Sequence, residues 1–460
     1  MMIRSYIGDR KFYRRLFTIT LPLVIQQLIT TLVQLIDNIM VGSLDESAIN
    51  SVSVVNQLYF VFILITFGVL GGAGIFSAQY YGSKDFEKLR ETFRFKVVVG
   101  FGVSLLAIIT FTLFGRQLFM LFTQTEDTVT NGLNYLAVTK YSLIPLALSI
   151  AISTTFREIG ITRPLLYISI IAVLTNTILN YGLIFGNFGL PRLEVLGAGI
   201  ATLIARILEF ILTFIFYLKR GTLFKTKFLR LFRIEKKVLI GITAMALPLT
   251  LNEAFWSLGQ TAFLFSYAQR GDTALAAMYI TNAVSQLVFV TFGAVGTGVA
   301  VLVGNTLGAN ELEQAKDNAK KLIAFAVMIA TFAGTILFIL SYFVLDFYQI
   351  DQSTKNIAMF NIRVNAFFIP FFSYNVAMYF VLRSGGDTFS TVLMDSGYMW
   401  IIAVPIALTL AYFTALPVTM MFLIIQGLDI PKAFIATTRF KKEKWLRNLA
   451  ISAEIIKNPE

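Results

Sequence analysis

The stretch from Leu21 to Gly42, LPLVIQQLITTLVQLIDNIMVG, is long and apolar enough to cross a bilayer, yet it contains polar groups. A carboxylate at membrane depth costs about 2.5–3.5 kcal/mol even on the lenient insertion scale, so such a group is a functional candidate by default. We therefore expect Asp37 to titrate or to hold a cation, and the alternative is an acid at the span end that reaches water. Its polar neighbours are Gln26, Gln27, Gln34 and Asn38.

Neutral polar side chains on two later apolar stretches could complete a site around Asp37. Asn176 and Asn180 are four residues apart and therefore share one helix face, and Thr202 follows the sequence Gly-Ala-Gly. One carboxylate among neutral oxygens suits Na⁺, and it also suits an acid that exchanges its proton for a cation. The alternative role of each neutral residue is a hydrogen bond between helices. The candidate cation-coupling residues are thus Asp37, Asn176, Asn180 and Thr202.

A second deep acid, Glu253, lies about 16 residues into another apolar stretch, or about 24 Å by helical rise. It is a candidate for a second coupling site or for pairing with a cationic substrate. No metal is expected beyond a possible Na⁺ at Asp37 or Glu253. Further polar candidates for this second site are Gln34, Asn282, Gln286, Tyr374 and Asn375.

The composition excludes several classes of function. The 460 residues are 57% hydrophobic and 14% charged, against about 25% charged in soluble domains, so a membrane protein is expected. The chain has no cysteine and no histidine, which removes disulfides, thiolate and imidazole catalysis and the usual zinc and haem ligands. No P-loop is present. We therefore expect that the protein is not an enzyme and binds no cofactor. We expect its coupling ion to be Na⁺ or H⁺.

The apolar stretches predict an all-α polytopic protein with twelve transmembrane helices, because they are about 20 residues long rather than alternating ten-residue segments. Of the 38 Lys and Arg, thirty-one fall on the side of the N-terminus, four on the opposite side and three inside spans. This asymmetry places both termini in the cytoplasm and explains the net charge of +12 without a nucleic-acid partner. The predicted spans are 16–41, 51–80, 96–115, 132–156, 164–186, 196–218, 239–267, 276–305, 322–345, 357–382, 389–411 and 415–435.

The chain is duplicated at an offset of 226 residues, which aligns Leu21-Pro22-Leu23 with Leu247-Pro248-Leu249 and LRSGGDT with the segment around Arg157. Six spans per repeat predict two lobes of equal orientation, related by a pseudo-twofold axis, with a substrate cavity between them and alternating access. Glycines of the second and eighth spans suit either close packing or bending. The expected parts are an N-terminal lobe at 1–218, a basic cytoplasmic linker at 219–238, a C-terminal lobe at 239–435 and a cytoplasmic tail at 436–460.

The two repeats differ in their deep polar residues. Gln27 aligns with Glu253, whereas Asp37 aligns with Phe263 and therefore has no acidic counterpart. Asn176 and Asn180 align with Ile402 and Ile406. This asymmetry favours an ion site around Asp37 and a substrate or pairing site around Glu253.

Four motifs together resemble the multidrug and toxic compound extrusion (MATE) transporters of bacteria: the first span itself, LGAGIATLIAR, LRSGGDT and RFKKEKWLRN. The resemblance covers the whole chain and implies export of cationic, often aromatic compounds in exchange for Na⁺ or H⁺. It also implies that Asp37 couples to the cation together with Asn176, Asn180 and Thr202. Two departures leave the ion open. One branch of the family has an acid at the position of Asn180, which is an amide here. Another branch has acids in both the seventh and tenth spans, whereas this chain has Glu253 in the seventh and only Asn375 nearby in the tenth.

The leading hypothesis is a multidrug efflux antiporter in the inner membrane of a bacterium, working as a monomer, with small organic cations and the lipid bilayer as its partners. The alternative is a flippase for a lipid-linked precursor of the same superfamily, which would need a cationic cavity for phosphate. Asp37 and Glu253 are both acidic and favour cationic cargo.

Overall fold

The computed structural model describes residues 6–123, 125–348 and 350–451, and every regular element within them is helical. Eleven helices or helix pairs there are long and apolar enough to cross a membrane. The remaining span is α9, which continues through a π-helical turn, η4, into α10, so the twelve-helix, two-lobe layout predicted from the sequence is confirmed. The helices are α1 Arg10–Gly42, α2 Glu46–Gly82, α3 Phe86–Met120, α4 Glu126–Thr139, α5 Leu143–Glu158, α6 Arg163–Phe185, α7 Glu194–Arg220, α8 Lys236–Ala268, α9 Asp272–Val299, η4 Ala300–Gly304, α10 Asn305–Gly308, α11 Leu312–Leu340, α12 Gln352–Ser384, α13 Thr388–Val392, η6 Leu393–Gly397, η7 Met399–Ala403, α14 Val404–Phe413, α15 Val418–Gly427 and α16 Asp429–Lys441.

Several helices extend past the predicted spans and carry basic residues with them. Lys96, the first residue of the predicted span 96–115, lies within α3, which begins at Phe86. Arg383 lies in the last turn of α12, one residue past the predicted span 357–382, and Lys432 lies within α16, near the predicted end of the span 415–435. A basic residue near the end of a predicted span therefore does not always face water. The helix continues past that residue, and the side chain pairs with a residue of another helix.

The packing divides the chain into two compact units, whose boundaries fall inside two helices. The N-terminal unit comprises residues 21–250, and the C-terminal unit comprises residues 1–20 and 251–460. The boundaries lie beside Pro22 of α1 and Pro248 of α8, the prolines of the duplicated Leu-Pro-Leu motif. Proline inside a helix removes one backbone hydrogen bond and disturbs the preceding turn. Each helix therefore changes its packing partners close to its proline.

Glycines allow the first half of α8 to pack within the N-terminal unit. A Cβ atom added to Gly68 or Gly72 of α2 would collide with the backbone of Thr250 or Ala246 of α8. In the C-terminal unit, Gly298 of α9 packs against the side chains of Leu16 and Thr20 of α1, at 3.1 and 3.3 Å from the position of an added Cβ. Gly72 and Gly298 are equivalent in the repeat, as are Ala246 and Thr20, so the duplication preserves this contact.

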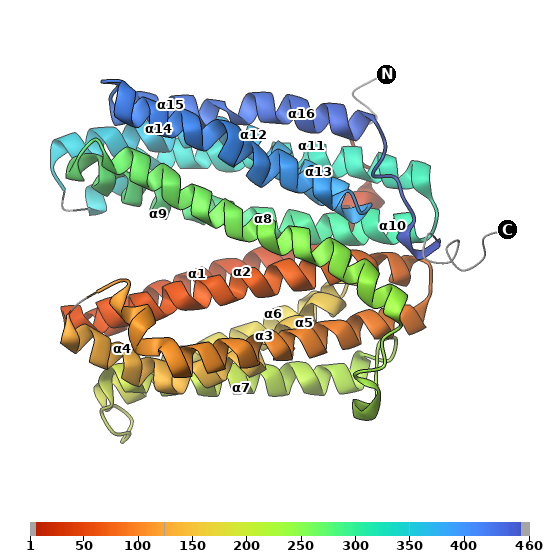
Figure 1. Ribbon diagram of the computed structural model, residues 1–460, viewed down its shortest axis with the longest axis horizontal. Coiled ribbons are helices and arrows are strands. Elements are labelled where there is room, and N and C mark those ends of the chain that lie inside the picture. The colour runs from red at the N-terminus through yellow and green to blue at the C-terminus, as the bar shows by residue number, and fades with distance from the viewer. Residues whose placement is uncertain (1–5, 124, 349, 452–460) are drawn as a thin grey trace. The chain divides into compact units, whose positions relative to one another are not determined.

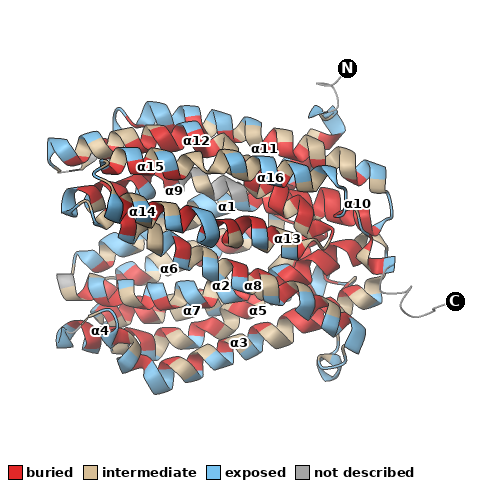
Figure 2. Ribbon diagram, turned by 45° about the horizontal axis from the view of Figure 1, so that its top comes forward, coloured by how far each residue is buried: buried red, intermediate tan, exposed pale blue. Residues whose placement is uncertain are grey.

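The helices of each unit can be followed by colour in Figure 1, where α2 to α7 run from orange to yellow-green and α9 to α16 from green to blue. Figure 2 shows that most helices are buried on one side and exposed on the other. On α3 the exposed side carries Leu105, Leu106, Ile109 and Leu113. Apolar side chains on an outer helix face are suited to lipid, since the backbone hydrogen bonds are already satisfied within the helix.

A buried ion pair joins α3 to α5 in the N-terminal unit. Lys96 Nζ donates to Glu158 Oε2 at 2.5 Å and to Thr155 Oγ1 at 3.3 Å. The Lys96 side chain is fully buried, and that of Glu158 is 10% exposed. Charges withdrawn from water are tolerated only when they are paired, so each of these two residues depends on the other.

We expect Lys96→Met to destabilise the protein by about 3–5 kcal/mol, because it leaves the Glu158 carboxylate buried without its cation. The measurement is thermal unfolding of the purified protein in detergent. The double variant Lys96→Met with Glu158→Gln, which removes both charges, should recover much of the loss. Equal stability of the single and double variants would contradict the pairing.

Candidate ion and substrate sites

The structure brings three of the four predicted cation-coupling residues together in the N-terminal unit. Asp37 lies on α1, and Asn176 and Asn180 lie one turn apart on α6. Asn180 Nδ2 donates to Asp37 Oδ1 at 2.8 Å and lies 3.5 Å from Asn176 Oδ1. The amide oxygen of Asn180 is buried and has no hydrogen-bond partner in the described part of the chain. The oxygens of Asp37 and Asn176 thus converge on the Asn180 side-chain nitrogen where α1 and α6 meet.

The fourth residue, Thr202 on α7, has a different set of bonds. Its hydroxyl donates to the Ala198 carbonyl of its own helix at 3.0 Å and is also a hydrogen-bond partner of Tyr135. The structure gives Thr202 no hydrogen bond to Asp37. Thr202 therefore contacts Tyr135, which lies within electrostatic range of Asp37. Its role as a direct ligand of the ion stays a prediction.

Asp37 has no close cationic partner among the described residues. Arg206 of α7 acts on it electrostatically, but Arg206 forms its ion pair with Glu209 at 2.7 Å. The i, i+3 spacing of these two residues brings their side chains together on one face of α7. A carboxylate that is compensated only by an amide and a more distant charge can accept a proton or a small cation. Na⁺ would be held by carboxylate and amide oxygens, which hard cations prefer.

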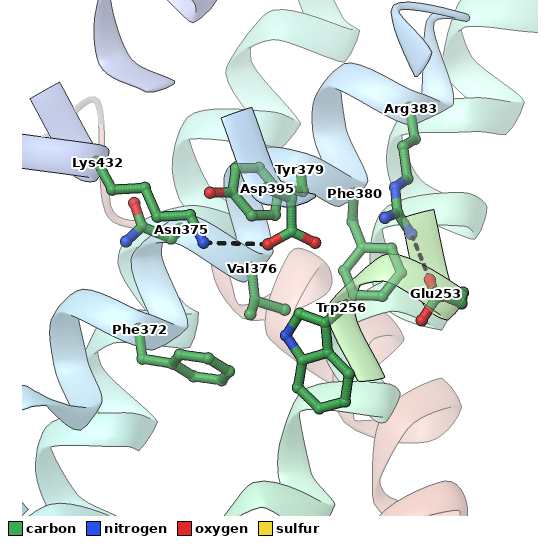
Figure 3. A pocket seen from close by; sticks show the side chains of 10 residues that line it. All are labelled: Glu253, Trp256, Phe372, Asn375, Val376, Tyr379, Phe380, Arg383, Asp395 and Lys432. Atoms are coloured by element: carbon green, nitrogen blue, oxygen red, sulfur yellow. Dashed lines mark hydrogen bonds and ion pairs between the residues drawn. The ribbon is translucent and has the colours of Figure 1, made fainter. Parts of the chain in front are cut away.

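The C-terminal unit contains a cavity of about 170 Å³ that combines charged and aromatic side chains (Figure 3). Its wall comes from α8, α12, η6 and α16. Glu253 and Asn375, both predicted for a second site, lie in this wall. The full lining is Glu253, Trp256, Phe372, Asn375, Val376, Tyr379, Phe380, Arg383, Asp395 and Lys432.

On one side of the cavity, Glu253 of α8 pairs with Arg383 of α12. Arg383 Nη1 lies 3.6 Å from Glu253 Oε1, and the guanidinium lies over the Phe380 ring at 5.7 Å from its centroid. The Nε of Arg383 is buried and has no hydrogen-bond partner in the described residues. In Figure 3 the arginine reaches from the end of its helix towards the carboxylate.

On the other side, Asp395 is held by two donors. Lys432 Nζ donates to its Oδ1 and Asn252 Nδ2 to its Oδ2, both at 3.0 Å. Asp395 lies in the π-helical turn η6, a type of helix distortion that is frequent at functional sites. Asn375 Nδ2 lies 3.4 Å from the carboxylate of Asp429, one turn before Lys432. Lys432 was not predicted from the sequence, although its i, i+3 spacing from Asp429 places both side chains on one helix face.

The other predicted residues of the second site are not in the cavity wall. The Tyr374 hydroxyl bonds with Thr437 Oγ1 at 2.6 Å. Asn282 and Gln286 are exposed on α9, outside the lining. Gln34 is exposed on α1 in the N-terminal unit. Within the described residues, no group of three or more His, Cys, Asp or Glu is arranged to hold a metal ion.

Two repeated sets of apolar helices with charges inside each unit define a class of polytopic membrane proteins to which many secondary transporters belong. The family model described as MatE matches residues 22–182 and 248–413, which is more than half of the chain. The chain therefore belongs to the MatE family, and the resemblance to MATE transporters that the sequence suggested is confirmed.

Relatives and solved structures agree with this assignment. The chain is 24% identical over 413 residues to the probable multidrug resistance protein YoeA of Bacillus subtilis, with 88% of each chain covered. A multidrug resistance MATE family transporter in an outward-facing conformation matches with a TM-score of 0.84 at 17% identity, over 96% of this chain and 98% of that one. A MOP superfamily transporter from Pyrococcus furiosus, whose binding pocket of reverse polarity suggests a different function, matches with a TM-score of 0.83 at 16% identity, over 99% of both chains.

We expect Asn180→Asp to make the protein more responsive to Na⁺ or to protons, because two adjacent carboxylates cannot both ionise without a shared cation. Thermal stability measured against Na⁺ concentration at several pH values tests this. Asn180→Leu, which removes the amide without adding a charge, is the matched control and should not gain this response. A variant that responds to Na⁺ and pH as the unmodified protein does would contradict an ion site at Asp37.

Proposed function

We propose that this protein is a secondary antiporter that exports cationic, amphipathic organic compounds in exchange for Na⁺ or H⁺ by alternating access. The observation that carries the proposal is the environment of Asp37, a carboxylate inside a membrane span whose direct partner is the neutral amide of Asn180. The negative charge of such a carboxylate is stabilised strongly when a cation binds to it. The ion site of this proposal is formed by Asp37, Asn176 and Asn180, with Thr202 as a further member.

The chemistry of the cavity supports an organic cation as the cargo. Trp256, Phe372, Tyr379 and Phe380 supply aromatic faces that attract cations, and Glu253 supplies a negative charge. A relative is named a probable multidrug resistance protein. We propose that Glu253 and Asn375 act in cargo binding or as a second coupling site, with Gln34, Asn282, Gln286 and Tyr374 as further candidates.

Exchange requires that the ion and the cargo prefer different conformations. In this proposal an ion at Asp37 favours one conformation and an organic cation near Glu253 favours the other. Only differential affinity of each ligand for the two conformations can produce coupling. No nucleotide site is needed, because the ion gradient supplies the free energy.

The topology predicted from the charges completes the proposal. The six-helix lobes at 1–218 and 239–435 carry the transport cycle, with a basic linker at 219–238 and a tail at 436–460, and both termini lie in the cytoplasm. The site of action is the inner membrane of a bacterium, and the working unit is a monomer.

The alternative, a flippase for a lipid-linked precursor, would need unpaired positive charge for a phosphate. The two cations of the cavity, Arg383 and Lys432, are each paired with a carboxylate. The cavity therefore has no unpaired positive charge for a phosphate, which speaks against this alternative.

The test is ethidium efflux from proteoliposomes under separately imposed Na⁺ and H⁺ gradients. We expect one gradient to drive efflux in the unmodified protein and Asp37→Asn to abolish it while the protein stays folded. Normal gradient-driven efflux by Asp37→Asn would refute the coupling role.

Glu253→Gln separates the role of this residue in cargo binding from a structural one. We expect it to weaken transport of cationic dyes more than transport of neutral dyes, because only the cations lose a charge partner. Equal loss for both kinds of dye, measured in the same proteoliposomes, would indicate a structural role for Glu253.

A further inference from the structure

We propose that Arg383 is an internal counter-ion that occupies the cation position of the cargo site and is displaced from Glu253 when an aromatic organic cation binds. This inference rests on the proposed function, since it concerns the same cavity. It assigns to Arg383 a role in setting the affinity and the release of the cargo.

The surroundings of the Arg383 guanidinium are those that an aromatic cation would seek. The guanidinium is planar and cationic, lies 5.7 Å from the centroid of the Phe380 ring and pairs with the Glu253 carboxylate. An aromatic face next to a carboxylate is a general arrangement for binding organic cations. The Arg383 guanidinium therefore makes the contacts that an aromatic organic cation would make at this site.

Arg383 is held less firmly than the other charged pairs of its unit. Its ion pair with Glu253 measures 3.6 Å, whereas charge-assisted hydrogen bonds between nitrogen and oxygen measure about 2.7–2.9 Å. Arg439, in contrast, donates twice to Asp387, at 2.6 and 2.9 Å. The buried Nε of Arg383 adds no further bond within the described residues. A competing cation thus has fewer and weaker hydrogen bonds to replace at Glu253 than at Asp387.

The cavity is small for a drug-sized cargo, and the movement of one side chain would enlarge it. Sites for drug-sized ligands measure about 300–1,000 Å³, whereas this cavity measures about 170 Å³. Arg383 is a long, flexible side chain at the end of α12, with 16% of its side chain exposed. Its withdrawal would enlarge the cavity and free the Glu253 carboxylate in one movement.

The repeat provides a natural comparison, because Arg157 is the counterpart of Arg383 at the offset of 226. Arg157 Nη2 donates to the side-chain oxygen of Gln26 on α1 at 3.2 Å, and its Nε is likewise buried and unpaired in the described residues. Both units therefore direct an arginine at the first helix of their repeat. On the first helix of its repeat, Arg157 meets an amide whereas Arg383 meets a carboxylate. Competition for a carboxylate on that helix is therefore specific to Arg383, although Glu158 of α5 and Glu209 of α7 act on Arg157 electrostatically.

Displacement has a consequence for transport. While Arg383 pairs with Glu253, the carboxylate is compensated in the absence of cargo, and the returning arginine helps to expel a bound cation. Without the arginine, Glu253 would hold an organic cation more tightly and release it more slowly. Affinity and maximal rate should therefore change in opposite directions.

The experiment measures ethidium binding by fluorescence on the purified full-length protein and ethidium efflux from proteoliposomes. We expect Arg383→Gln to bind ethidium about tenfold more tightly, which corresponds to about 1.4 kcal/mol, and to have a lower efflux rate at saturating ethidium. A neutral dye should gain no such affinity. Arg383→Lys, which keeps the charge, should bind ethidium as the unmodified protein does or only slightly better.

Arg157→Gln is the matched control, since it removes the equivalent arginine from its amide acceptor Gln26 and should leave ethidium affinity unchanged. Weaker or unchanged ethidium binding by folded Arg383→Gln, or the same gain in Arg157→Gln, would overturn the inference. Glu253→Gln distinguishes the two proposals. If it binds ethidium as well as the unmodified protein does, cargo binding at Glu253 fails; if it binds weakly while Arg383→Gln gains nothing, only the displacement of Arg383 fails.

Discussion

The cost of removing charge from water governs how this protein is built. Inside a membrane span a charged side chain is tolerated only with a partner, so most deep charges here are paired within one compact unit. Lys96 pairs with Glu158 in the N-terminal unit, and Lys432 pairs with Asp395 in the C-terminal unit. In the loop between α8 and α9, Arg270 likewise donates to four backbone carbonyls at the end of α14 and just after it, at 2.7–2.8 Å. These pairs account for charges that have no need of a ligand.

Asp37 and Glu253 depart from this rule in different ways. Asp37 has an amide as its direct partner, whereas Glu253 has a cation that is held at 3.6 Å and lines a cavity. An incompletely compensated carboxylate favours a small ion, and a loosely compensated one among aromatic rings favours exchange with an organic cation. The two units thus contain different sites on the same duplicated scaffold, and the account assigns the ion to one and the cargo to the other.

Much of the fold could be predicted from the sequence, because apolar length and the 226-residue repeat depend only on local composition. The cluster of Asp37, Asn176 and Asn180 could be predicted as well, since a deep acid and a pair of amides at i, i+4 are visible in the spans. The partners of Lys432 and Arg383 could not be predicted. Both residues lie where a span was expected to end, and a basic residue there is ordinarily solvated. Their acids lie on other helices, and only tertiary packing shows which helices meet. The division of α1 and α8 between the two units was missed for the same reason, although Pro22 and Pro248 lie beside both boundaries.

The central claim is that an ion at Asp37 and an organic cation near Glu253 favour different conformations, and its most direct test is the binding linkage between them. Ethidium affinity of the purified protein is measured across Na⁺ concentration and across pH, and the affinity of the ion is measured with and without ethidium. The account predicts that one of the two ions weakens ethidium binding, that ethidium weakens binding of that ion by the same factor, and that Asp37→Asn abolishes both effects. Ethidium affinity that is independent of both Na⁺ and pH in the unmodified protein would contradict it.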